Sequence, residues 1–512
     1  YFGQNRVRYD RFDARVLRTA HFDVHHDARA DATARDAARM AERWYARVSE
    51  AFGGHEFADR KPIVFYTDHP DFQQTLIGGG GGISEGTRGF AEGVRDRLVM
   101  PFAAVPAETD HVLGHEVVHL FQFDVAERSG GGIGRILSLP LWFVEGQAEY
   151  LALGREDPNT AMWLRAALVR GRLPSIAQLS TDPSLFPYRY GHAFWAYVGG
   201  RWGDEAVDAL FRAALALGVE GAVARVLEVS PEELAQGWHA SIADAYAAGL
   251  AGRELPGALG RRVFPDGGAR ALFVSPSVSP DGRLLAAFAA RGVLGLDLVL
   301  ADAATGRILR SLAAPKTDGH TDAISFLYAT GAWSPDGRRF AHVVIRRGDH
   351  ELAITDVRSG RLWRRVRVRD VQSISAVAWS PDGQRLAIAG TRDGQPDLFL
   401  YDLAERTVQQ LTDVGFARLL SAWGPDGRLL AVATDQGGGT DLGTLHFGRP
   451  RLALVDPVGG RLRPLPIPAG FDGARMSNPQ WSPDGRGLYF VSDAGGVADV
   501  FRLEVATGRV GR

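Results

Sequence analysis

The chain has 512 residues, 45% of them hydrophobic, and a formal net charge of −2 at pH 7. Its length predicts two or three domains with ordinary hydrophobic cores. The near-neutral charge gives no electrostatic basis for binding nucleic acid. The absence of cysteine excludes disulfides and thiolate metal sites, and no apolar run approaches the roughly 20 residues that span a membrane.

The first hundred residues predict a small sheet with one long helix. Residues 17–25 alternate apolar and polar side chains, and residues 62–67 form a short apolar run, so both predict strands. Residues 30–52 are rich in Ala and Arg and predict a helix. Five consecutive glycines at 78–82 predict a loop that could cover a cleft. Residues 89–100 end in an alternating run, which predicts another strand.

The sequence HEVVH at residues 115–119 is the strongest chemical motif in the chain. It lies within residues 109–124, which lack Pro and contain one Gly and therefore predict a helix. Positions i and i+4 of a helix share one face, so His115 and His119 can bind one zinc ion. Glu116 is then placed to accept a proton from a water that zinc activates. The alternative is an amphipathic helix with two buried histidines of no chemical role.

A second segment, LPLWFVEGQAEY at residues 139–150, supplies a candidate third ligand. A catalytic zinc site needs three protein ligands and one open position. Glu145 lies on a segment whose helix Pro140 can start. Two antiparallel helices joined by the glycine-rich residues 129–134 would bring Glu145 over the two histidines of the first motif.

Together these segments resemble the gluzincin metallopeptidases, which include the thermolysin-like and aminopeptidase N-like families. The run Trp-Phe-Val-Glu-Gly-Gln-Ala is similar to the aminopeptidase segment that carries the third ligand, although the gap after HExxH is longer here. The best match is to peptidase MA-like domains fused to propellers in bacterial envelope proteins, over about residues 1–250. The resemblance implies an α+β domain with zinc as cofactor, Glu116 as general base and three metal ligands, His115, His119 and Glu145.

The resemblance also implies roles for four further residues. Glu149 would accept a hydrogen bond from the first zinc-binding histidine; the alternative is a solvated carboxylate. Tyr190, or else His192, would stabilise the oxyanion of the tetrahedral intermediate, unless these residues only pack the core. The strand ending at Met100 would pair with extended substrate, and Glu92 would bind a free peptide N-terminus. His111, one turn before the motif, is expected to be an ordinary helix residue.

Helical patterns continue through residues 205–217 and 231–247, and the stretch 249–260 mixes Gly, Pro and charge. We expect the boundary between domains in that stretch. The predicted domains are a metallopeptidase-like domain, residues 1–252, and a second domain, residues 262–512.

The second domain is repetitive. Ser-Pro-Asp-Gly or a close variant occurs five times, with prolines at positions 280, 335, 381, 425 and 483, and a Trp precedes four of the five copies. A period of about 40–50 residues with strand-turn-strand content predicts an all-β propeller. The region resembles TolB-like propeller repeats, in which Asp caps each turn and Gly supplies the positive φ. Two alternatives stay open, a five-bladed ring and part of a longer propeller, and we expect the second.

The sequence therefore predicts a multidomain zinc peptidase of peptide or protein substrates, exported to the periplasm or the exterior of a bacterium. The propeller would dock a protein partner or substrate. One alternative is a non-catalytic envelope binding or assembly protein with a relict metal site. Another is a zinc hydrolase that acts on a non-peptide amide. Glu116 favours catalysis, because a structural metal site needs no base.

Overall fold

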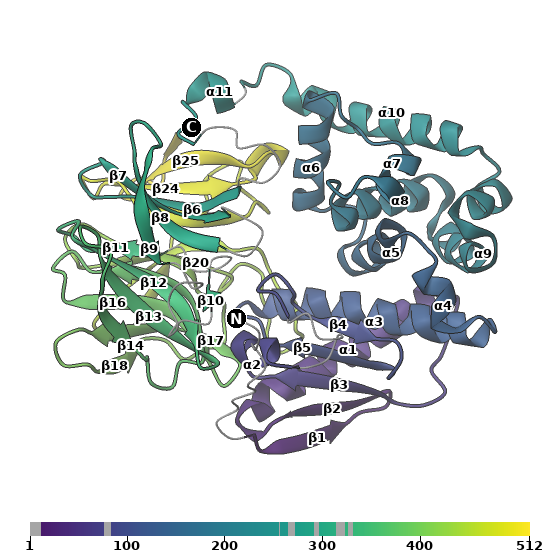
Figure 1. Cartoon of the computed structure of the whole chain (residues 1–512), viewed down its shortest axis with the longest axis horizontal. Helices are drawn as coiled ribbons and strands as arrows, with labels where there is room; N and C mark the ends of the chain where they lie inside the picture. The colour runs from purple at the N-terminus through teal and green to yellow at the C-terminus, as the bar shows by residue number, and fades with distance from the viewer. Residues whose placement is uncertain are drawn as a thin grey trace.

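The computed structural model describes residues 12–75, 83–254, 256–264, 272–290, 296–313, 323–325 and 331–511. The expected loop at residues 78–82 lies outside these ranges. Figure 1 shows an N-terminal region of mixed sheet and helices on the right and a five-bladed β-propeller on the left. The predicted order, a first part with sheet and helices followed by an all-β propeller, is therefore confirmed.

A five-stranded mixed sheet opens the N-terminal region, in the order β1-β2-β3-β5-β4. The expected strand at residues 17–25 is instead a hairpin, because the backbone turns between Arg18 and Phe22. β2, β3 and β5 run parallel, and β4 pairs antiparallel with β5 at the edge. The strands are β1 (Ala14–Arg18), β2 (Phe22–Asp27), β3 (Lys61–Tyr66), β4 (Phe90–Glu92) and β5 (Arg97–Pro101).

Helices make up most of the rest of this region. Proline occupies the first turn of several of them, where its missing N–H has no helical partner to lose. None of the described helices has both the length and the apolar run needed to cross a bilayer. The helices are α1 (Asp31–Ala51), α2 (His69–Gln73), α3 (Pro106–Arg128), α4 (Gly132–Leu137), α5 (Leu141–Leu153), α6 (Pro158–Val169), α7 (Ile176–Thr181), α8 (Pro187–Trp202), α9 (Asp204–Ala222), α10 (Pro231–Leu250) and α11 (Pro256–Leu259).

The core packs α5 tightly between α3 and α8. Gly146 of α5 and Gly191 of α8 let the two backbones touch: a Cβ on Gly191 would lie 2.1 Å from the Trp142 carbonyl oxygen. Trp142, Phe143 and other large side chains of α5 are fully buried around this contact. Both glycines therefore hold α5 and α8 at a separation that no larger residue permits.

The propeller consists of antiparallel sheets, one for each repeat counted in the sequence. Each sheet is one blade and carries the same number. Sheet 1 contains β6 (Leu272–Val278), β7 (Leu284–Ala290), β8 (Leu296–Asp302) and β9 (Ile308–Ala313); sheet 2 β10 (Ala323–Ile324), β11 (Ala332–Trp333), β12 (Arg339–Arg346), β13 (Asp349–Asp356) and β14 (Leu362–Val366); sheet 3 β15 (Ser373–Trp379), β16 (Arg385–Arg392), β17 (Gln395–Asp402) and β18 (Val408–Gln410); sheet 4 β19 (Leu419–Trp423), β20 (Leu430–Thr434), β21 (Arg451–Val455) and β22 (Leu462–Pro464); sheet 5 β23 (Met476–Trp481), β24 (Gly487–Ser492), β25 (Asp499–Glu504) and β26 (Val510–Gly511).

The repeated turn explains why the motif recurs. Asp336 accepts hydrogen bonds from the Ser334 hydroxyl at 2.5 Å and from the Arg338 amide at 3.0 Å, and Gly337 has φ of +66°. These are the contacts expected of an Asp that caps a turn. The Trp before the turn joins neighbouring blades at three of the repeats: Nε1 of Trp333, Trp423 and Trp481 donates to a backbone carbonyl of the preceding blade.

Blade 4 carries a long connection that reaches the N-terminal region. Residues 435–450 join β20 to β21, whereas two residues join the corresponding strands of blades 2 and 3. We call residues 435–450 the blade-four arm. Leu445 at its tip is 4% exposed and lies within the hydrophobic core of the N-terminal region. The two halves of the chain therefore share a core, which the sequence did not predict.

Candidate metal centre

Helices α3 and α5 run antiparallel, as the sequence predicts. His115 faces Glu149, His119 faces Glu145, and Gln122 reaches the Val144 carbonyl, so higher numbers on α3 meet lower numbers on α5. The connection between them is not the expected plain loop, because residues 132–137 form the short helix α4.

Three side-chain atoms converge between these helices. His115 Nε2, His119 Nε2 and Glu145 Oε2 are each 3.1 Å from the other two. Ligands held about 2.0–2.1 Å from a tetrahedral zinc ion lie about 3.3 Å apart, so one ion fits this triangle. Both histidines are buried, with exposed fractions of 7% and 5%. The chain thus contains a candidate His115–His119–Glu145 metal-binding group.

The charges of the triad are strongly coupled. Burial alone would raise the pKa of Glu145, but His119 and His115 together hold that pKa far below its usual range. Burial alone would lower the pKa of His119, but the Glu145 and Glu116 carboxylates raise it to about 9. Two imidazoles and one carboxylate held this closely form a site suited to a divalent cation.

Gln122 orients the second histidine, a role that the sequence analysis missed. The His119 Nδ1–H donates to Gln122 Oε1 at 2.7 Å, which leaves Nε2 free to face the triad. The Gln122 amide nitrogen donates to the Val144 carbonyl and to Gln147 Oε1, at 3.1 and 2.8 Å, which fixes the orientation of the amide. Its position three residues after His119 in a buried helix was the available signal.

We expect Gln122→Ala to weaken metal affinity by about 10–100-fold, because the imidazole of His119 loses the partner that sets its tautomer and ring orientation. Titration with zinc in the presence of a competing chromophoric chelator measures this change. Gln236→Ala, at an exposed position of α10, is the matched control and keeps the parental affinity. Equal affinities for the two variants would show that Gln122 only packs the core.

Glu149 lies behind the first histidine. Its Oε1 is 3.6 Å from His115 Nδ1, and its Oε2 is 3.4 Å from both His111 Nε2 and Arg189 Nη1. Burial alone would raise the pKa of Glu149, but His111, His115 and Arg189 lower it to about 2. An ionised carboxylate at this place is suited to hold the His115 ring, and His111 contacts it too.

Glu116 points toward the edge strand. Its side chain is 6% exposed, it accepts a hydrogen bond from the Ala91 amide of β4, and its Oε2 has no partner within the described residues. Burial raises the pKa of Glu116 despite the nearby His115 and His119. A buried carboxylate oxygen without a partner is costly, so its presence beside three candidate ligands needs a chemical explanation.

The segment 187–195 reaches the triad through Tyr188. Its ring stacks on His115 with centroids 5.9 Å apart, and its hydroxyl donates to Glu145. Tyr190 is buried against Trp163, with ring centroids 6.3 Å apart. His192 Nε2–H donates to the Gly154 carbonyl at 2.8 Å. Tyr190 and His192 were the two residues expected to stabilise the oxyanion. The structure brings neither of them to the triad.

Glu92 is engaged by its own hairpin. Its Oε2 accepts a hydrogen bond from Arg97 Nε at 2.7 Å, and Arg95 Nε lies 3.7 Å from the other oxygen. Two guanidinium groups already neutralise this carboxylate, so it lacks the free charge that binding a peptide N-terminus requires.

Comparison with known proteins assigns the second half of the chain. A family model described as the TolB beta propeller domain, PD40, matches residues 323–448. The C-terminal half is a TolB-like β-propeller. No curated protein matches the chain.

Solved structures similar to the chain include TolB from Acinetobacter baumannii, at 18% identity over 55% of this chain and 59% of that one, with a TM-score of 0.33. Putative TolB from Agrobacterium tumefaciens is 20% identical over 47% of this chain and 80% of that one, with a TM-score of 0.37. A puromycin-hydrolyzing peptidase from Mycobacterium tuberculosis is 23% identical over 48% and 38%, with a TM-score of 0.34. The chain thus spans 59% of the length of the first TolB.

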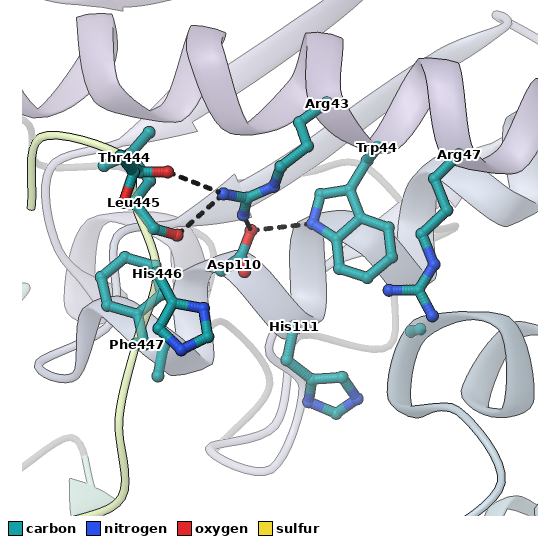
Figure 2. Close-up of a pocket in the computed structure, with 11 residues that line it drawn as sticks. Arg43, Trp44, Arg47, Asp110, His111, Thr444, Leu445, His446 and Phe447 are labelled. Carbon is teal, nitrogen blue, oxygen red and sulfur yellow. Dashed lines mark hydrogen bonds and ion pairs between the residues drawn. The ribbon is translucent and has the colours of Figure 1, made fainter. Parts of the chain in front are cut away.

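The TolB-like propeller also borders the metal centre. A pocket of about 720 Å³ lies where the blade-four arm meets α1, α3 and α5. Figure 2 shows the Asp110 carboxylate directed to Arg43 and Trp44, with the rings of His111 and His446 and the Arg47 guanidinium around the pocket. His111 belongs both to this pocket and to the group around Glu149.

Proposed function

We propose that the chain is a zinc-dependent peptidase of gluzincin type. The observation that carries the proposal is the convergence of His115, His119 and Glu145 at 3.1 Å beside the unpartnered oxygen of Glu116. A structural metal site has no use for an adjacent buried base, so the geometry favours hydrolysis over the alternative, a binding protein with a relict metal site.

In this proposal the triad would hold zinc, which when bound polarises the scissile carbonyl and lowers the pKa of a coordinated water to about 7. Glu116 takes the proton of the attacking water on Oε2 and transfers it to the leaving amine. Its raised pKa makes it a stronger base than an exposed Glu. Glu149 and Gln122 hold the two imidazoles in place.

Tyr188 is our candidate for stabilising the oxyanion, in place of Tyr190 or His192. Burial and the carboxylates of Glu145, Glu116 and Glu149 all raise the pKa of Tyr188, so its hydroxyl keeps the proton that it donates. Because the hydroxyl bonds to the proposed ligand Glu145, it would be within reach of a carbonyl that zinc polarises.

The substrate would pair with β4 and not with the strand around Met100, because that strand is β5, which lies inside the sheet between β3 and β4. Strand β4 is the edge of the sheet, and its Ala91 amide bonds to Glu116. An extended peptide can add to such an edge by main-chain hydrogen bonds, which would align its scissile bond with the triad. Glu92 is not assigned a part in this binding, because Arg97 occupies its carboxylate.

Metal analysis of protein purified without an affinity tag, followed by assay against a peptide library, tests the proposal. We expect about one zinc per chain and hydrolysis that a chelator abolishes and added zinc restores. Protein that contains zinc and cleaves no peptide would support the binding-protein alternative. Cleavage confined to non-peptide amides would support the third alternative.

We expect Tyr188→Phe to keep zinc and to lose about 10²–10³-fold in kcat, because the reaction loses a donor to its oxyanion. Steady-state kinetics with a peptide from the library measure the loss. Tyr190→Phe removes a hydroxyl from the same helix at a site away from the triad and keeps the parental kcat. A loss of kcat in Tyr190→Phe with none in Tyr188→Phe would return the oxyanion role to Tyr190.

We further propose that the TolB-like propeller docks a protein partner and limits access to the cleft. The blade-four arm supports this, since it fixes the propeller against the helices that carry the triad. We keep residues 1–252 and 262–512 as the proposed domains, joined in one core by the arm. A periplasmic or extracellular location is proposed from the resemblance of both halves to bacterial envelope proteins.

A further inference from the structure

The pocket beneath the blade-four arm lies next to the metal triad. His111 lines it, and His111 precedes His115 by one helical turn, a separation of about 6 Å. The two histidines share Glu149, whose carboxylate oxygens lie 3.4 Å from His111 Nε2 and 3.6 Å from His115 Nδ1. The pocket is therefore separated from His115 by about one turn of α3.

The pocket has more side chains that can donate hydrogen bonds to an anion than it has carboxylates. Two arginines and two histidines line it, against a single carboxylate, that of Asp110. Asp110 Oδ1 is already engaged, because Arg43 Nη2 donates to it at 2.5 Å and Trp44 Nε1 at 2.8 Å. Arg47 has no carboxylate partner within the described residues, and its guanidinium lies over the Trp44 ring, 5.0 Å from the centroid.

Both halves of the chain build the pocket walls. The arm contributes the backbone and side chains of residues 444–447, including Leu445 and Phe447, which pack against the N-terminal core. Arg43 Nη1 donates to the Leu445 carbonyl at 2.7 Å, so the pair Arg43–Asp110 holds the arm in place and is not free for a ligand. Arg47 and His446, one from each half, are left to face the cavity (Figure 2).

We infer that this pocket is a specificity subsite of the proposed peptidase, in which Arg47 and His446 bind a carboxylate of the substrate peptide. The inference rests on the proposed function. The carboxylate belongs to an Asp or Glu side chain near the scissile bond or to the peptide C-terminus. A charge-assisted hydrogen bond from the Arg47 guanidinium, which lies over the Trp44 ring, would hold this carboxylate. The propeller would thereby take part in choosing the substrate.

Matched peptides test the inference. Peptides cleaved in the library assay are prepared with Glu or Gln at each position near the scissile bond, and with a free or an amidated C-terminus. We expect the parental protein to prefer one carboxylate form in kcat/KM, and Arg47→Gln and His446→Gln to reduce that preference, by about 10–100-fold for Arg47→Gln. The control is Arg35→Gln, which should keep the preference. Arg35 lies more than three turns before Arg47 on α1 and is paired with Asp31.

A preference for Glu over Gln assigns the carboxylate to a side chain, and one for the free terminus assigns it to the C-terminus. Absence of either preference, or a preference that survives in both Arg47→Gln and His446→Gln, would overturn the inference while the peptidase proposal stands. Binding of fluorescein-labelled library peptides to Glu116→Gln protein separates the two proposals. Arg47-dependent binding of acidic peptides that the parental protein never cleaves would retain the subsite and refute the peptidase.

Discussion

Replacing Glu116 by Gln is expected to leave zinc content unchanged and to lower kcat by about 10²–10⁴-fold. The amide has nearly the shape of the carboxylate but cannot accept the proton that attack on the peptide requires. The neighbouring carboxylates of Glu145 and Glu149 lie against His115 and His119, so neither is free to act as the base. Metal analysis and steady-state kinetics on the same preparation provide the two measurements.

Glu127→Gln is the control for this experiment. Glu127 lies on the same helix but is exposed, so its variant should match the parental protein in zinc content and in kcat. Full activity in Glu116→Gln would remove the proposed mechanism altogether, because both proton transfers, from the attacking water and to the leaving amine, use this carboxylate. The binding-protein alternative would then be the better account of the metal site.

Glu145→Ala is expected to abolish stable metal binding and, with it, all hydrolysis. Among the described residues, the substitution removes the only carboxylate oxygen that lies 3.1 Å from both imidazole nitrogens. Two histidines alone would leave zinc without its third ligand. The substitution also removes the negative charge of Glu145, which helps to raise the pKa of His119 to about 9 in the parental protein. The zinc content, measured by elemental analysis after dialysis, should fall from about one zinc per chain to near zero.

Glu156→Ala, an exposed position between α5 and α6, controls for loss of negative charge and keeps its zinc. If Glu145→Ala retained full occupancy, the third ligand would be another residue, and Glu149 would be the next to test. Glu149→Ala, by contrast, is expected to keep the three ligands and to disturb the ring orientation of His115.

The candidate metal-binding group of His115, His119 and Glu145 could be predicted because its information is local. The spacing of His115 and His119 places both on one face of any helix, and a second helix beginning near Pro140 needs only to run back along the first to deliver Glu145. The turn motif of the propeller is local in the same way, since Ser334, Asp336 and Gly337 contact one another within a few residues.

Tyr188 could not be selected from the sequence, because the choice depends on the rotation of α8. Residues 188 and 190 are about 200° apart around a helix, so only one of them can face the triad. The contact between Gly146 and Gly191 sets this rotation, and it joins residues far apart in the chain. The pairing of Glu92 with Arg97 likewise appears only once β4 lies against β5.

The blade-four arm imposes an order on biosynthesis. Arg43 and the carbonyl of Leu445 that it binds are 402 residues apart, and a ribosome adding 5–20 residues per second needs about 20–80 s to cover that interval. In the second part of this time the N-terminal region has been made but lacks Leu445, a buried member of its core. The nascent N-terminal region therefore exposes the apolar surface that Leu445 covers in the complete structure, until blade 4 leaves the ribosome. Chaperones can bind such a surface.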